Sequence, residues 1–184
     1  MNPGSQESAE ETDLALIARW KAGDSRAATE LVSRHADSLA RFATSAGERE
    51  EIEELVQDTF VRAFSSLDAF RGESSLRTWL FTIERRLMLD RRRAEKRQRS
   101  LVPIEEAEGA TEYDALDGMV AQETAIRVRR AVAALTPMQR EVFTMRVEQG
   151  LAYKDIAVIL DTSEGAARVH YHNAMCAVKE FLDD

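Results

Sequence analysis

Residues 51–67 carry an apolar pattern that fits an α-helix and does not fit a strand. Within EIEELVQDTFVRAFSSL, apolar positions recur every three or four residues, with charged or polar residues between them. Residues at this spacing share one side of a helix, whereas a strand would divide them between its two faces. The stripe consists of Ile52, Leu55, Val56, Thr59, Phe60, Ala63, Phe64 and Leu67. Such a helix needs neighbours on which to bury this stripe.

The neighbouring sequence predicts that those partners are also helices. In residues 13–24, DLALIARWKAGD, the apolar residues Leu14, Ile17 and Ala18 share one helical face, and residues 25–43 repeat the same spacing. The 184 residues include only eight Gly and three Pro, which disfavours the turn-rich composition of a β sandwich. We therefore predict an all-α fold.

A fourth apolar stripe, residues 76–87, runs into a strongly basic tract. Eight Arg and Lys lie between Arg85 and Arg99, against only Asp90 and Glu95, although the whole chain has a formal charge of −8. Such a cluster can contact phosphates with an affinity that falls steeply with salt. The alternative is a solvated helix end without a specific partner.

After this tract the sign of the charge reverses, which indicates a domain boundary. Residues 100–126 contain seven acidic residues and no Lys or Arg. We expect a disordered tail over residues 1–11, a first helical domain over 12–99, a flexible acidic linker over 100–122 and a second helical domain over 123–184.

The second domain has the pattern of a helix-turn-helix. In LTPMQREVFTMRVEQG, Thr136 is suited to cap a helix, Pro137 to begin it and Gly150 to follow its end. The segment YKDIAVIL predicts a short amphipathic helix, DTSEG a tight turn, and the remainder a longer helix to about residue 182.

Several classes of protein are disfavoured. The chain has no apolar run of about 18 residues and no signal peptide, so we expect a soluble, cytoplasmic protein without membrane insertion. Phosphate-loop, Rossmann, serine-hydrolase and zinc-protease motifs are missing, so we expect neither an enzyme nor a cofactor. His172 and Cys176 share a helical face, but His170 points across the helix, so no metal site is predicted.

Three strings together resemble the extracytoplasmic-function (ECF) sigma factors of bacterial RNA polymerase, within the sigma-70 family. They are EELVQDTFVRAF, FRGESSLRTWLFTI and LTPMQREVFTMRVEQGLAYKDIAVILDTSEGAA, and the resemblance spans residues 12–99 and 127–182. It implies a subunit that binds core RNA polymerase and directs it to promoter DNA. The first domain would read and melt the −10 element, the second would read the −35 element, and an anti-sigma factor would control the protein.

The resemblance also implies roles for particular residues. For contact with the −10 region it implicates the basic tract and the preceding loop: Phe70, Arg71, Ser74, Ser75, Arg85, Arg86, Arg91, Arg92 and Arg93. For binding to core polymerase it implicates the outer face of the third helix: Glu54, Asp58, Val61 and Arg62. For contact with the −35 region it implicates the last helix: Arg168, His170, Tyr171 and Asn173. The plain alternative for the loop is an ordinary connection with a serine cap, and Trp79 is expected in the core.

Two departures from the family pattern bear on function. Where relatives often read IARN, this chain reads IERR, so Arg86 replaces an Asn and Glu84 replaces a small residue. Arg can only donate hydrogen bonds to a base, so base preference at the −10 element is expected to differ. Where relatives read like GTVKSRLHRARKRL, this chain reads GAARVHYHNAMCAV, which predicts weak −35 binding by this domain alone.

Two other functions fit parts of the sequence. A helical protein-binding adaptor would explain the loss of basic residues from the last helix, but not the intact basic tract. A stand-alone helix-turn-helix repressor would usually bind DNA as a dimer, and the sequence contains no evident dimerisation helix.

Overall fold

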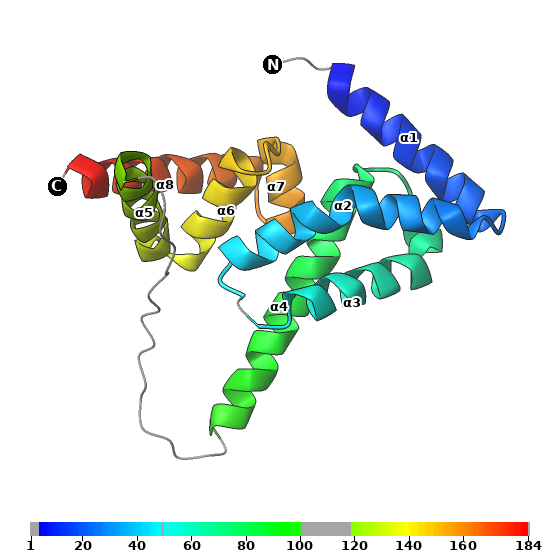
Figure 1. Cartoon of the computed structure of the whole chain (residues 1–184), viewed down its shortest axis with the longest axis horizontal. Coiled ribbons are helices and arrows are strands. Elements are labelled where there is room, and N and C mark those ends of the chain that lie inside the picture. The colour runs from blue at the N-terminus through cyan, green and yellow to red at the C-terminus, as the bar shows by residue number, and fades with distance from the viewer. Residues whose placement is uncertain (1–3, 49, 101–118, 184) are drawn as a thin grey trace.

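The computed structural model describes residues 4–48, 50–100 and 119–183 (Figure 1). Within these ranges every regular element is helical, which confirms the all-α prediction. The elements are α1 (Gly4–Lys21), α2 (Ser25–Ser45), α3 (Ile52–Ser65), the 3₁₀ turn η1 (Leu67–Ala69), α4 (Leu76–Ser100), α5 (Met119–Ala134), α6 (Pro137–Val147), α7 (Tyr153–Leu160) and α8 (Glu164–Asp183).

The first unit, α1–α4, is built around the stripe of α3. Leu55, Phe60 and Ala63 are buried as the periodicity predicts, and α3 packs on both α2 and α4. Across the core, the rings of Phe42 in α2 and Phe81 in α4 meet edge to face with centroids 5.1 Å apart. Burial of this apolar surface is the main force that holds the four helices together.

The buried face of α1 differs from the sequence expectation. Leu14 and Ala18, which we placed on the apolar face, are exposed, Leu14 by 52%, whereas Ile17 is buried as expected and Leu16 is buried beside it. The reason is an ionic contact: the Asp13 carboxylate turns inward, where it lies 2.8 Å from Arg34 Nη1 and 2.9 Å from His35 Nε2. This contact fixes the rotation of α1 on α2.

The second unit, α5–α8, contains the predicted helix-turn-helix in α7 and α8. Thr136 caps α6 and Pro137 begins it, as the sequence predicted, and the Gln139 side chain completes a capping box. After α7 the chain turns at Asp161, whose φ is 52°, and the Ser163 hydroxyl accepts a hydrogen bond from the Ala166 amide at the start of α8. α8 packs against α5, α6 and α7.

Helix ends differ from the expected boundaries in two places. α1 begins at Gly4, so residues 4–11 are helical rather than a disordered tail. α5 begins at Met119, inside the expected linker. Both extensions consist mainly of good helix formers such as Ala, Glu and Gln, which continue a helix without an apolar stripe. The rest of the linker, residues 101–118, lies outside the described residues.

The two units pack against each other. α7 lies on α4 and α6 lies on the end of α2 (Figure 1). One continuous apolar core contains Phe81 and Met88 of the first unit together with Val142, Met145 and Ile159 of the second. Among the described residues, no helix combines the length and apolar character needed to cross a bilayer.

Candidate nucleic-acid and polymerase interface

The basic tract continues α4 as a helix, so its arginines point in several directions. Two of them hold the first unit together. Arg91 lies 3.1 Å from Asp58 and within 3.7 Å of Glu54 on α3. Arg92 lies 2.8 Å from Glu48 and donates a hydrogen bond of 2.6 Å to the Ala46 carbonyl after α2. Arg91 and Arg92, which we predicted to contact DNA, therefore already have partners within the first unit.

Arg86 and Arg93 lie on the open side of α4. Both are exposed; Arg93 approaches Asp90 at 3.4 Å, whereas the side chain of Arg86 has no hydrogen bond or ion pair among the described residues. Of the predicted arginines in α4, these two are the most available to an external anion.

Arg85 points instead to the second unit. Its Nε donates a hydrogen bond of 2.8 Å to the Glu141 carboxylate on α6, and the two side chains are only 14% and 8% exposed. Two turns earlier on α4, Arg77 donates a hydrogen bond of 2.8 Å to the side-chain oxygen of Gln149, which follows α6. Sequence reasoning missed Glu141, Arg77 and Gln149, because nothing in a single sequence pairs residues 56 or 72 positions apart.

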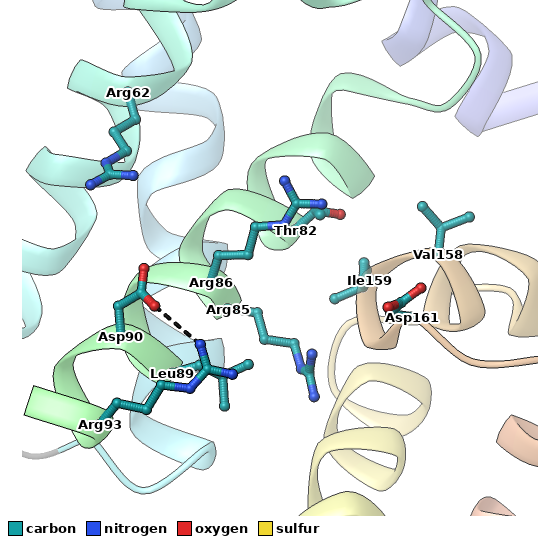
Figure 2. Close-up of a pocket in the computed structure, with 10 residues that line it drawn as sticks. All are labelled: Arg62, Thr82, Arg85, Arg86, Leu89, Asp90, Arg93, Val158, Ile159 and Asp161. Atoms are coloured by element: carbon teal, nitrogen blue, oxygen red, sulfur yellow. Dashed lines mark hydrogen bonds and ion pairs between the residues drawn. The ribbon is translucent and has the colours of Figure 1, made fainter. Parts of the chain in front are cut away.

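A hollow of about 450 Å³ separates the basic side of the first unit from α7 (Figure 2). The arginines Arg62, Arg85, Arg86 and Arg93 line it from α3 and α4, and Val158, Ile159 and Asp161 line it from α7 and the turn that follows. Figure 2 shows Arg85 extending towards α6 while Arg86 extends in a different direction. Asp90 and Asp161 also line the hollow, but the four guanidinium groups outnumber these two carboxylates, so this surface is suited to bind phosphate oxygens.

In the loop before α4, some residues stabilise the fold and others are exposed to solvent. The Ser75 hydroxyl accepts a hydrogen bond from the Thr78 amide and so caps α4, which is the plain role for a serine at this position. Phe70 packs on Trp79, with ring centroids 5.2 Å apart, and both are partly buried against the core. Arg71 is exposed and Ser74 is half-buried. Of this loop, Arg71 presents its side chain most freely.

The outer face of α3 carries the predicted polymerase-binding residues side by side. Val61 is 63% exposed and has Arg62 beside it, while Asp58 and Glu54 lie one and two turns away towards Arg91. Because single exposed apolar side chains are common on protein surfaces, polymerase binding by this face stays a prediction.

The predicted reading residues of α8 divide between the core and the surface. Tyr171 is half-buried between the rings of Phe143 and Tyr153, at centroid distances of 6.4 and 5.9 Å. Arg168 lies over the ring of Tyr153 and pairs with Glu164 one turn earlier. Asn173 is exposed and His170 is partly exposed.

The side chains of His172 and Cys176 approach each other on α8. Cys176 Sγ lies 3.7 Å from His172 Nε2, as expected for residues four positions apart on one helical face. Within the described residues, no group of three or more possible metal ligands comes together.

Glu84, the residue that replaces a small one in the family pattern, is fully buried in α4. Neither of its carboxylate oxygens has a hydrogen-bond partner among the described residues. Burial raises the pKa of Glu84 to about 9, and the nearby Glu48 carboxylate adds to this effect, so the group is neutral at pH 7. The sequence showed that Glu84 departs from the family pattern, but it did not show that the side chain is buried.

Comparison with known proteins agrees with this architecture. Residues 31–98 match the family Sigma-70 region 2, and residues 125–176 match the family Sigma-70, region 4. The ECF RNA polymerase sigma-E factor of Haemophilus influenzae is 32% identical over 169 residues, covering 85% of this chain and 88% of that protein. The sigma-E factor of Escherichia coli strain K12 is 28% identical, covering 91% and 92%.

Two solved structures have the same fold. The sigma factor RpoE of Bartonella quintana, solved in complex with the anti-sigma factor NepR, is 28% identical with a TM-score of 0.65, covering 84% of this chain and 96% of that one. CnrH, solved in complex with the cytosolic domain of CnrY, is 29% identical with a TM-score of 0.67, covering 93% and 97%.

Proposed function

Because the chain belongs to the ECF sigma factors of the sigma-70 family, we propose that it binds core RNA polymerase and directs promoter-specific initiation of transcription. The observation that carries this conclusion is the presence, in order, of both sigma-70 regions over the two helical units. The protein itself supplies specificity, and the polymerase supplies the chemistry of RNA synthesis. We accordingly place its action in the cytoplasm, with the polymerase.

In this proposal the first unit reads the −10 element through the open side of α4 and the loop before it. Arg86, Arg93 and Arg71 are the primary contacts, because their side chains are exposed. Arg91 and Arg92 act mainly by holding α4 on α3 and α2, since their guanidinium groups already have carboxylate partners. Arg85 can join the DNA contacts only when Glu141 no longer holds it.

The second unit would read the −35 element with α8, through His170, Asn173 and Arg168. This helix has few basic residues, so its affinity for DNA alone is expected to be low. Attachment of both units to the polymerase would make binding bivalent and compensate for this weakness. The exposed face of α3 around Val61 would contact the polymerase.

Control by an anti-sigma factor is part of the proposal. Two structures similar to this chain were solved with such a partner or with the cytosolic domain of CnrY. An anti-sigma factor would act here by keeping the polymerase-binding and DNA-binding faces covered.

Run-off transcription with purified core polymerase on a promoter library tests this function. We expect start sites that appear only when the protein is added, and we expect Arg86→Ala to weaken them. Arg26→Ala is the matched control, because it removes the same charge from an exposed position on α2, outside the elements proposed to contact DNA and polymerase. Binding to polymerase without start sites would favour the adaptor, and failure to bind polymerase would refute the proposal.

A further inference from the structure

We propose that the hollow between α4 and α7 is a binding site for a small polyphosphate, an anion with two or three linked phosphate groups, either free or as part of a nucleotide. Arg62, Arg86 and Arg93 would hold the phosphates (Figure 2). Free protein would bind such a ligand without polymerase or promoter DNA, so the site does not depend on the proposed function. Only one consequence does: the ligand would compete with DNA for Arg86 and Arg93.

The arginines with no partner in the protein are the first observation. Among the described residues, the side chains of Arg62 on α3 and Arg86 on α4 make no hydrogen bond or ion pair, and both are exposed. Arg93 has a single exposed contact, with Asp90 at 3.4 Å, which a more highly charged anion can replace. Guanidinium groups bind phosphate oxygens through paired, charge-assisted hydrogen bonds. Three such groups are therefore available to an anion in the hollow.

The spacing of these groups fits linked phosphates better than a single phosphate. Arg86 and Arg93 lie on the same face of α4, seven residues and so about 10 Å apart along the helix axis. A single phosphate group can reach both only if the two side chains bend together, whereas a chain of two or three phosphates can span the distance. Arg62 adds a third guanidinium group from the α3 side of the hollow (Figure 2).

The shape of the hollow favours a small molecule. Its volume of about 450 Å³ falls within the range of roughly 300 to 1,000 Å³ that is usual for small-molecule sites. Figure 2 shows Arg62 on one side of α4 and Val158 and Asp161 on the other. Val158 is 56% exposed and, with Ile159, provides apolar surface on the α7 side. This surface is suited to pack against the base of a nucleotide.

Negative charges in and around the hollow limit which anions can bind. Asp90 lies beside Arg93, and Asp161 follows α7. Both carboxylates repel an anion, so a ligand must contact several guanidinium groups at once to bind. The formal charge of −8 on the whole chain disfavours binding of anions elsewhere on the surface. Saturable binding of a polyphosphate would therefore require the clustered arginines.

Isothermal titration calorimetry on the full-length protein, without polymerase and at about 0.15 M salt, tests the proposal. The probes are pyrophosphate, tripolyphosphate and ADP, with orthophosphate as the single-phosphate comparison. We expect saturable binding of the linked phosphates about tenfold more tightly than orthophosphate, or better, because they make at least one more charge-assisted contact. For the same reason, Arg62→Ala and Arg86→Ala should each weaken binding of tripolyphosphate by about tenfold.

Two further variants separate loss of the site from a change in net charge. Arg26→Ala removes one positive charge from an exposed position on α2, which does not line the hollow, and its affinity should stay within about twofold of wild type. Arg86→Lys keeps the charge but not the paired hydrogen bonds of a guanidinium group, so it should retain part of the affinity that Arg86→Ala loses.

Methyl NMR locates the ligand without any substitution. Saturating ADP should shift the methyl resonances of Leu89, Val158 and Ile159, which line the hollow, and leave those of Val169, exposed on α8, unchanged. Tighter binding of ADP than of pyrophosphate, with the difference removed by Val158→Ala, would identify a nucleotide as the ligand. Equal binding of the two would identify the phosphate chain alone.

The proposal is overturned if no linked phosphate shows saturable binding, if orthophosphate binds as tightly, or if Arg62→Ala and Arg86→Ala lower the affinity no more than Arg26→Ala does. Run-off transcription separates this outcome from failure of the proposed function. Start sites from a protein that binds no polyphosphate would leave the sigma-factor function standing without this site. Polyphosphate binding without start sites would leave the site standing without that function.

Discussion

The Glu84→Gln substitution tests how far the buried carboxyl group of Glu84 lowers the free energy of unfolding. Glu84 is inaccessible to solvent, and neither of its oxygens has a hydrogen-bond partner among the described residues. Burial raises its pKa to about 9 from an ordinary value of 4.5. Glutamine has nearly the same shape and stays neutral, so the substitution removes the proton uptake and little else.

The sign of the effect follows from the two pKa values. The unfolded chain loses the Glu84 proton near pH 4.5, while the folded chain keeps it until about pH 9. Folding therefore takes up a proton between these values, and the wild-type protein loses stability as the pH rises through this range. At 1.36 kcal/mol per pH unit, the cost at pH 7 is about 3 kcal/mol.

Urea denaturation at pH 5, 6, 7 and 8 measures this difference in the free energy of unfolding. We expect the Glu84→Gln variant to equal wild type near pH 4.5 to 5 and to be more stable by about 3 kcal/mol at pH 7. For a chain of this size the gain corresponds to about 6 to 12 °C in Tm. Glu95→Gln, at an exposed position on the same helix, is the control and should show no such trend.

Parallel pH profiles for the Glu84→Gln variant and the wild type would refute this reasoning. They would mean that Glu84 is ionised in the folded protein, with a partner or water that satisfies its oxygens. A variant less stable than wild type at pH 7 would refute it as well.

Three further predictions concern individual side chains of the two units. Arg86→Asn should change the preferred base at the −10 element, because Asn can both donate hydrogen bonds to a base edge and accept them from it. Unchanged start sites on the promoter library would show that Arg86 does not set the base preference. Arg92→Ala should lower the free energy of unfolding by about 1 to 3 kcal/mol, because it removes the contacts with Glu48 and the Ala46 carbonyl. Urea denaturation measures this loss, and an unchanged stability would contradict the structural role of Arg92. Thr136→Ala should cost about 1 kcal/mol by removing the capping box of α6, measured in the same way, whereas Thr136→Ser should retain the cap.

The helices could be predicted from the sequence because each buries one continuous stripe. The stripe of α3 is the clearest case, since its spacing alone identified Leu55, Phe60 and Ala63 as core residues. The orientation of α1 could not be predicted in this way. It depends on the pairing of Asp13 with Arg34 and His35, a contact between residues more than twenty positions apart.

Aromatic residues on α8 illustrate a second limit of sequence reasoning. Tyr171 stands where the family resemblance suggests a DNA contact, and an amphipathic tyrosine is suited both to a core edge and to an interface. Only the positions of Phe143 and Tyr153 show that its ring packs inward. Its role in reading DNA stays a prediction, to be tested together with the exposed Asn173.

The basic tract shows why a run of charges can predict that a helix binds nucleic acid but cannot predict which of its residues are accessible. Successive residues on a helix point about 100° apart, so a run of arginines must surround the helix rather than form one face. Neighbouring arginines of α4 therefore have different surroundings: Arg85 is held by Glu141, whereas Arg86 is exposed. While Glu141 holds Arg85, DNA can therefore reach fewer positive charges than the net charge of the tract suggests. Replacing Glu141 by alanine removes the acceptor that holds Arg85, so the salt dependence of DNA binding should become steeper by about one phosphate contact. An unchanged slope for the Glu141→Ala variant, compared with wild type, would show that Arg85 makes no contact with DNA phosphates.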